Sequence, residues 1–300
     1  MEKRKNRIHY NLGDRIFIAS TYVIVSLVVL ITLYPFLYLI SVSISNHQAV
    51  LNGEVMLFPK GPFDLKSYEV FFADSGIWRA YWNSILYSVV AAVFGLFVNS
   101  CAAYALSQPI FRWRKQFTLF FMVPMFVGGG MIPTYVLISS LGMIDTMWPL
   151  VLPGALSTWY LLIFRTFFNN DIPDSLRESA ILDGANEFQV YIRIVLPLSK
   201  AIFATVAMYY LVGQWNSYFS PMLYLNSQEL YPLQIILQRK LAVNYGQKLD
   251  AAMMYNEYSA IPAEAMRCAA ILASALPIMC IYPFIQKYFV KGVMIGAVKG

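Results

Sequence analysis

The most regular spacing of chemically distinctive residues in this chain lies in residues 171–197, a charged segment between two apolar stretches. Its spaced positions are Glu178, Ala180, Gly184, Ile194, Leu196 and Pro197. These residue types form no nucleophile–base pair and no set of metal ligands, so the chemistry they favour is binding. A charged loop of this kind between membrane helices is typical of a docking platform for a cytosolic protein.

The same segment predicts two short helices joined by a bend. Asp171 or Asp174 can cap the first helix near Pro173, and Ser175 with Glu178 also matches a capping box. The first helix is expected over residues 176–183 and is expected to end at Gly184, which suits a left-handed turn.

A second helix is expected to begin at a cap on Asn186, and Pro197 is expected to redirect the chain. The second helix would carry Phe188, Tyr191, Ile192 and Val195. Small residues near the bend, Ser179, Ala180 and Ala185, would let a partner surface come close. An amphipathic pair of helices resting on lipid is the alternative.

Weakly polar side chains interrupt the apolar stretches and are candidates for contacts with a substrate. They are Asn99, Ser100, Thr134, Tyr135, Ser157, Gln214, Asn216 and Ser217. Hydroxyls and amides pair with the hydroxyl groups of a sugar, but hydrogen bonds between helices are the alternative use of each. The group Gln214-Trp215-Asn216 with Tyr218 is the best candidate, because it joins amides to an aromatic face.

A run of three glycines, residues 128–130, superficially suggests phosphate binding, but no Lys-Ser/Thr follows it. Pro124 and Pro133 flank the run, so it predicts a break in a membrane helix where substrate could pass. Gly129, Gly130, Thr134 and Tyr135 are therefore further candidates for the substrate path.

Several kinds of chemistry are not indicated. The sequence holds no Gly-x4-Gly-Lys-Ser/Thr loop for ATP, and no motif for covalent catalysis. His9 and His47 are expected at the surface, away from carboxylates or cysteines at metal-ligand spacing. Cys101, Cys268 and Cys280 are expected to be small buried hydrophobes. We therefore expect no enzyme activity, metal or cofactor in this chain.

Composition places the chain among membrane proteins. Of its 300 residues 59% are hydrophobic and only 13% are charged, against about 25% charged in soluble domains. The apolar stretches predict an all-α membrane protein with six transmembrane helices, the first of them kinked near Pro35. The expected spans are residues 16–44, 83–107, 117–141, 149–168, 198–223 and 264–289. Asp, Glu, Lys, Arg and His are absent from residues 17–44, 83–106, 117–141, 149–164 and 201–223, which disfavours a proton- or ion-coupled carrier.

The distribution of basic residues predicts the orientation. With the N-terminus inside, fifteen of the 22 Lys and Arg residues fall on the cytosolic side, so both termini and the loop 171–197 are cytosolic. This bias also accounts for the net charge of +6 without nucleic-acid binding. The predicted layout is a cytosolic segment 1–15, a membrane domain 16–290 and a cytosolic tail 291–300. The outer segments 46–82 and 225–262 are long enough to touch an external partner.

The loop residues resemble a known motif. Glu178-x-Ala180, Gly184 and Ile194-x-Leu196-Pro197 are similar to the cytoplasmic EAA loop of permease subunits of ABC importers, with Ser179 in place of the middle alanine. The matching stretches elsewhere resemble the carbohydrate branch, MalG-like permeases for oligosaccharides and uronate-oligosaccharides. These stretches are residues 129–135, 141–142, 183–185, 215–216, 231–234 and 296–300.

The resemblance implies the type I importer fold of a multi-pass protein in the bacterial cytoplasmic membrane. It also implies partners: a homologous second permease, two cytosolic ATPases that bind ATP and Mg, an extracytoplasmic solute-binding protein, and an oligosaccharide substrate. The coupling role would fall on Glu178, Ser179, Ala180, Asp183, Gly184, Ile194, Leu196 and Pro197. Glu178 would cap its own helix or meet a basic group on the ATPase.

Three alternatives differ in class. An ATP-independent secondary carrier would show intramembrane charge and internal repeats, and a sensor would carry a cytosolic signalling domain. An ABC permease for amino acids, peptides or polyamines would keep the loop and change the cargo. The sequence does not determine which sugar is transported, how many units it has or whether it is acidic. Arg165 at the inner end of the fourth span could face an acidic substrate or lie at the membrane interface.

Overall fold

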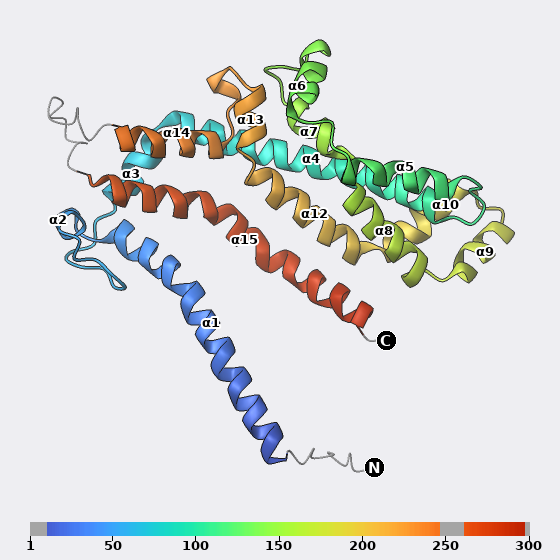
Figure 1. The fold of residues 1–300 in the computed structure, drawn as a ribbon, viewed down its shortest axis with the longest axis horizontal. Coiled ribbons are helices and arrows are strands. Elements are labelled where there is room, and N and C mark those ends of the chain that lie inside the picture. Colours follow the sequence, from blue (N-terminus) through green and yellow to red (C-terminus); the bar gives the residue numbers. More distant parts are fainter. Residues whose placement is uncertain (1–10, 247–260, 298–300) are drawn as a thin grey trace. The chain divides into compact units, whose positions relative to one another are not determined.

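The computed structural model describes residues 11–246 and 261–297, and every regular element within those residues is a helix. The chain divides into two compact units. The first comprises Met1–Ala73 and Asn244–Ala273, and the second comprises Asp74–Val243 and Ser274–Gly300. Figure 1 shows the helices in chain order. The all-α prediction is confirmed for the part of the chain that the structure covers.

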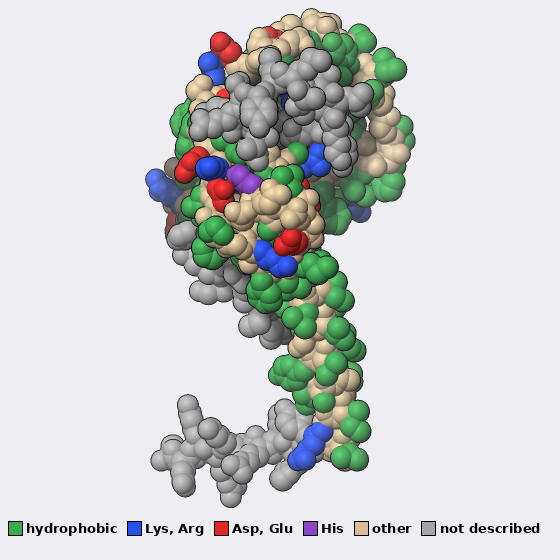
Figure 2. All heavy atoms as spheres, turned by 90° about the vertical axis from the view of Figure 1, so that its left-hand side faces the viewer, with side chains coloured by type: hydrophobic (Ala, Val, Ile, Leu, Met, Phe, Trp, Pro, Cys, Tyr) green, Lys and Arg blue, Asp and Glu red, His purple; other side chains and the backbone are tan. Residues whose placement is uncertain are grey.

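In the first unit, α1 (Leu12–Ile44) is capped by Asn11 and Asp14 and continues unbroken through Pro35. Hydrophobic side chains lie along the face of α1 that is seen in Figure 2, and of its residues only Ser41, Val42 and Ser43 are buried. A helix that is apolar on all sides is suited to lipid or to a partner helix. α2 (His47–Leu51) and α3 (Lys66–Ala73) follow.

The start of α15 (Ala263–Ala297) also belongs to the first unit, where Ala265 and Cys268 pack against Val42 and Val50. His9 lies outside the described residues. The surface prediction for His47 was wrong, because its Nδ1 lies 3.5 Å from Asp64 Oδ2 and its side chain is only 15% exposed. Of the three cysteines, Cys268 is buried as predicted, Cys101 is half-buried, and Cys280 is exposed.

The second unit is built around α4 (Ser75–Ser107), a helix of 33 residues. It packs against α12 (Lys200–Trp215), α8 (Thr158–Asp171) and α7 (Trp148–Ala155), as Figure 1 shows. The core between them contains Leu161, Phe164 and Val206, each fully buried.

The predicted break in the third span is present. α5 (Arg114–Phe126) and α6 (Met131–Ser140) meet at an angle of 113° around the glycine run, where Gly130 has φ +84°. A left-handed residue stops helical hydrogen bonding, and glycine adopts that conformation without steric cost. The break follows from local sequence alone.

Two further breaks were not predicted. α7 and α8 bend by 45° near Ser157, where an unbroken span was expected. Asn99 stabilises this break: its Nδ2 donates to Ala155 O at 2.6 Å, and its Oδ1 accepts from Ser157 N at 3.1 Å. The amide thus replaces the helical bonds lost at the bend, which are costly to leave unmade in a membrane.

The fifth predicted span, 198–223, is also divided. Its unpredicted break lies where α12 ends at Trp215, before α13 (Phe219–Tyr224). The 80° bend between the helical stretch Glu187–Leu198 and α12 lies at the start of this span, close to Pro197, where the chain was predicted to change direction. The remaining elements are η2 (Gln228–Leu230) and α14 (Leu233–Gly246). Three helices in the described residues are long and apolar enough to cross a membrane, or up to six spans if each bent pair counts as one.

Candidate functional site

The segment 171–197 forms two helical pieces around a bend, as predicted. The first is α9 (Asp174–Leu182), which ends in Asp183 and then Gly184 with φ +85°. The C-terminal turn is closed by Gly184 N donating to Ile181 O at 3.0 Å and Ala185 N donating to Ala180 O at 2.9 Å. Glycine is required here by backbone geometry, since nothing lies within 4 Å of an added Cβ.

The first helix starts near Pro173 as predicted, but the predicted capping side chains were wrong. α9 begins after Pro173 without a side-chain cap, so neither Asp171 nor the Ser175–Glu178 pair caps it. The Ser175 carbonyl instead accepts the Ser179 hydroxyl at 2.8 Å. Proline at the cap fixes an extended entry with φ −65°, which leads the chain into the helix without a side-chain bond. Glu178 is exposed, and its side chain does not cap its own helix.

The second piece begins at the predicted cap. Asn186 Oδ1 accepts from Gln189 N, and Asn186 N donates to Gln189 Oε1, at the start of α10 (Glu187–Val190). A π-helical turn, η1 (Tyr191–Val195), and α11 (Leu196–Leu198) continue it. The chain turns at Ser199 rather than at Pro197, because Pro197 occupies the first turn of α11, where its missing N–H costs nothing.

The motif residues divide between two faces. Ala180 and Ile194 are half-buried against the core, whereas Glu178, Gly184 and Pro197 are exposed. α9 buries none of its residues, and the apolar Leu182 and Phe188 are 88% and 69% exposed. An exposed apolar surface beside a sharp bend is suited to a protein partner.

A polar joint beneath these helices was missed by the sequence analysis. Glu187 of α10 accepts both Nε and Nη2 of Arg177 on α9, and it accepts the Tyr104 hydroxyl of α4 at 2.7 Å. The only local signal was an acidic and a basic residue ten positions apart. Their meeting depends on the bend at Gly184 and on α4.

The candidates for the substrate path do not form one cluster. Thr134 Oγ1 donates to Gly130 O at 2.8 Å, and Tyr135 stacks on Tyr224 with ring centroids 6.0 Å apart. Trp215 is buried, and its Nε1 donates to Ser274 O at 3.2 Å. Gly129, Asn216 and Tyr218 are exposed, and Gln214 is half-buried.

Three other polar residues have structural partners. Asn99 also donates to the Tyr210 hydroxyl at 2.8 Å, and Ser100 shares a hydrogen bond of 2.7 Å with Tyr191. Asn99 and Ser100 therefore serve the alternative role given for them above, which is hydrogen bonding between helices rather than contact with a sugar. Arg165 Nε donates to Leu106 O at 3.2 Å, so this guanidinium satisfies a carbonyl at the end of α4.

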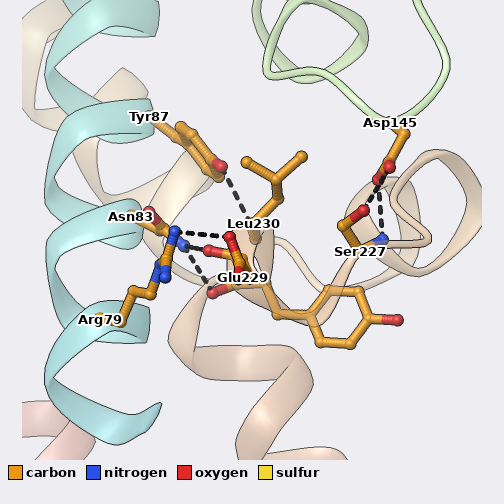
Figure 3. Close-up of polar contacts among 8 residues, drawn as sticks. Arg79, Asn83, Tyr87, Asp145, Ser227, Glu229 and Leu230 are labelled. Atoms are coloured by element: carbon orange, nitrogen blue, oxygen red, sulfur yellow. Dashed lines mark hydrogen bonds and ion pairs between the residues drawn. The ribbon is translucent and has the colours of Figure 1, made fainter. Parts of the chain in front are cut away.

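A second polar cluster lies at the other end of α4 and is drawn in Figure 3. Arg79, Asn83 and Tyr87, spaced four residues apart, share one face of the helix. Arg79 pairs with Glu229 at 2.9 Å, Asn83 donates to the Glu229 and Tyr231 carbonyls, and Tyr87 donates to Leu230 O at 2.9 Å. These bonds hold the backbone of η2 against α4.

Asp145 fastens a neighbouring turn to the same region (Figure 3). It has φ +61°, and its carboxylate accepts Asn226 N, Ser227 N and Ser227 Oγ at 2.9, 2.8 and 2.5 Å. The Ser227 hydroxyl and the Ser227 and Asn226 amides hold the pKa of Asp145 below its ordinary value. The stabilisation is therefore complete above the ordinary aspartate pKa and is lost only as the pH falls through the lower folded value.

We expect Asp145→Ala to expose the Asn226 and Ser227 amides, because both lose their acceptor and alanine is strained at positive φ. Hydrogen exchange of these two amides at neutral pH measures the effect. Asp145→Asn is the control, since asparagine tolerates this conformation and keeps one acceptor oxygen. Equal exchange in Asp145→Ala and the wild type would show that the clamp is not formed.

No group of three or more His, Cys, Asp or Glu that could hold a metal occurs in the searched part, residues 11–246 and 261–297. The family described as the binding-protein-dependent transport system inner membrane component matches residues 102–295. The chain belongs to this family. It is a permease subunit of an ABC importer and not an enzyme. The expectation drawn from the EAA loop is confirmed at the level of the family.

Several relatives match this permease over nearly its whole length. The polygalacturonan/rhamnogalacturonan transport system permease protein YtcP of Bacillus subtilis is 34% identical over 96% of this chain and 100% of its own. Protein LplC of the same species is 36% identical over 98% of each chain. The arabinooligosaccharides permease AraQ of Halalkalibacterium halodurans is 26% identical over 90% of this chain and 92% of its own.

Solved structures are also similar to this permease. A chain from the crystal structure of a bacterial ABC transporter involved in the import of the acidic polysaccharide alginate matches with a TM-score of 0.83 and 32% identity, covering 94% of this permease and 100% of that chain. A chain from an alginate transporter bound to its periplasmic protein matches at 0.57 with 17% identity, covering 92% and 96%, and supports the fold alone.

Proposed function

We propose that this permease forms half of the translocation path of an importer for acidic, uronate-containing oligosaccharides. The observation that carries the proposal is the similarity, above 30% identity over nearly the whole chain, to YtcP and to the alginate importer chain. Polygalacturonan is a polymer of a uronic acid, and alginate is named as an acidic polysaccharide. The cargo of both relatives thus combines sugar hydroxyls with carboxylates.

The path would be lined by exposed hydroxyl, amide and aromatic groups. Tyr135, Asn216 and Tyr218 have free surface, and the break at Gly129 and Gly130 opens the backbone of the third span. Thr134 and Gln214 are half-buried and Trp215 is buried, so these three would position their exposed neighbours.

Cationic groups at the outer end of α4 fit the acidic cargo. Arg79 and Arg239 line one cleft of about 620 Å³ together with Tyr231, Asp74 and Glu229, and the Arg239 guanidinium lies 4.3 Å from the centroid of the Tyr231 ring. The Arg79–Glu229 pair is more than half exposed on both sides, and such pairs contribute about 0–1 kcal/mol. A sugar carboxylate could therefore replace Glu229 at Arg79 at little cost.

The bent helices of residues 171–197 would dock on a cytosolic ATPase. Glu178 and Leu182 present a charge and an apolar side chain outward, and Gly184 leaves the bend open to close approach. Ser179, Ala180, Asp183, Ile194, Leu196 and Pro197 would shape this surface. Closure of two ATPases on ATP and Mg would move the loop and shift the permease between inward- and outward-facing states.

The proposed arrangement in the membrane counts the bent pairs α5–α6 and α7–α8 each as one span and takes α12 as the fifth span, so that Glu187–Leu198 stays in the docking loop. The permease then has six spans over residues 16–290, with cytosolic segments 1–15 and 291–300, in the bacterial cytoplasmic membrane. A homologous permease would supply the other half of the path. An extracytoplasmic solute-binding protein would deliver sugar to the outer end, where α4 holds η2.

The test is ATP hydrolysis by the complete importer in lipid nanodiscs with its binding protein. We expect stimulation by oligogalacturonate and not by the same oligosaccharide after reduction of its carboxyl groups, which is a control of equal length. Equal stimulation by both sugars would contradict an acidic cargo. Uptake by this permease alone without ATP would contradict the importer altogether.

A further inference from the structure

Glu187 occupies the point where three helices meet. Arg177 of α9 donates to the Glu187 carboxylate through Nε and Nη2. The Tyr104 hydroxyl of α4 donates to Glu187 Oε2 at 2.7 Å. Arg177 is 18% exposed and Tyr104 is 8% exposed, so both donors are shielded from water, whereas the Glu187 side chain that accepts their bonds is 40% exposed. A forked, charge-assisted contact of this kind fixes direction as well as distance.

A second contact lies one helical turn closer to the N-terminus of α4. Ser100 and Tyr104 are four residues apart on α4, and Glu187 and Tyr191 are four residues apart on the facing helix. Ser100 bonds Tyr191 at 2.7 Å, and the Tyr104 and Tyr191 rings lie 5.1 Å apart. Two matched contacts prevent the second helical piece from pivoting freely on α4.

α9 is held far less tightly than α10. It buries no residue, and a cavity of about 200 Å³ lies beside it, lined by Arg177, Asp174, Asn169 and Tyr104 among others. The bend at Gly184 links it to α10 through a single left-handed residue. Movement of α9 therefore requires little repacking, and the Arg177–Glu187 fork is its polar connection to the rest of the unit.

We infer that Glu187 is a positioning residue that transmits displacement of α9 to α4. This inference rests on the proposed docking of α9 on an ATPase. α4 continues from Tyr104 without a break to Arg79, Asn83 and Tyr87, which hold the outer segment around η2. One helix thus connects the docking loop with the outer end, and Glu187 joins the loop to that helix.

The experiment compares Glu187→Gln, Tyr104→Phe and Arg177→Gln in the complete importer. We expect the ATPases to copurify as in the wild type. Sugar transported per ATP hydrolysed should fall between about twofold and thirtyfold, the range found when coupling residues are replaced. Tyr209→Phe is the matched control, because Tyr209 stacks on Tyr160 and its removed hydroxyl is outside the joint.

Exchanging the charges of Arg177 and Glu187 tests whether this pair transmits the displacement of α9 or only stabilises the fold. Arg177→Glu with Glu187→Arg keeps the fork in reverse, so the double variant should recover transport per ATP beyond either single variant. Wild-type transport per ATP in Glu187→Gln, or no recovery in the double variant, would overturn the inference. Absence of sugar-stimulated hydrolysis in the wild type would instead overturn the proposed function, so the two failures are distinct.

Discussion

Replacing Gly184 by aspartate is expected to abolish sugar-stimulated ATP hydrolysis by the importer. Gly184 has φ +85°, a conformation that costs a residue with a side chain about 1–2 kcal/mol. Within the permease nothing lies within 4 Å of the added Cβ, so the substitution causes no steric clash inside this chain. The collision and the added charge would fall on the docked ATPase.

Copurification of the ATPases and stimulated hydrolysis together measure this effect. Gly142→Asp is the control, because Gly142 has φ +68° and equally open surroundings but lies outside the docking loop. It should carry similar backbone strain and keep its ATPases bound. Wild-type transport by Gly184→Asp would contradict the docking proposal, whereas equal loss of the ATPases in both variants would assign the effect to strain.

Replacing Gly95 by alanine is expected to disrupt the packing of α4 on α12. An added Cβ would lie 2.3 Å from Tyr210 Cζ and 2.7 Å from its hydroxyl oxygen. Tyr210 cannot simply move away, because its hydroxyl accepts from Asn99 at 2.8 Å and donates to Ala155 O at 3.0 Å. Overpacking of this kind destabilises by about 1–3 kcal/mol, and the break between α7 and α8 shares the same bonds.

Thermal unfolding of the purified permease in detergent measures the loss. Gly213→Ala is the matched control, since Gly213 lies in α12 with nothing within 4 Å of an added Cβ. Alanine there should leave the unfolding temperature unchanged or raise it, because it favours a helix over glycine. Equal unfolding temperatures for Gly95→Ala and Gly213→Ala would contradict the close contact with Tyr210.

The sequence alone determined the features that depend on local chemistry. Long apolar stretches without charge predicted a helical membrane protein, and the spacing around Gly184 indicated the family and the bend. The glycine run at 128–130 predicted the broken third span. Asn186 predicted the start of the second loop helix. Each of these follows from backbone preferences or from polarity over a few consecutive residues.

Only the tertiary structure decided the features that depend on residues far apart in the chain. The break near Ser157 follows Pro153 and Gly154, but it is stabilised by Asn99, 58 positions from Ser157. The joint at Glu187 needs Tyr104, 83 positions away. Asn99 and Ser100 were possible sugar ligands until packing placed partners beside them. A polar side chain has the same chemistry wherever it lies, and its role is decided by the donor or acceptor that the fold brings within reach.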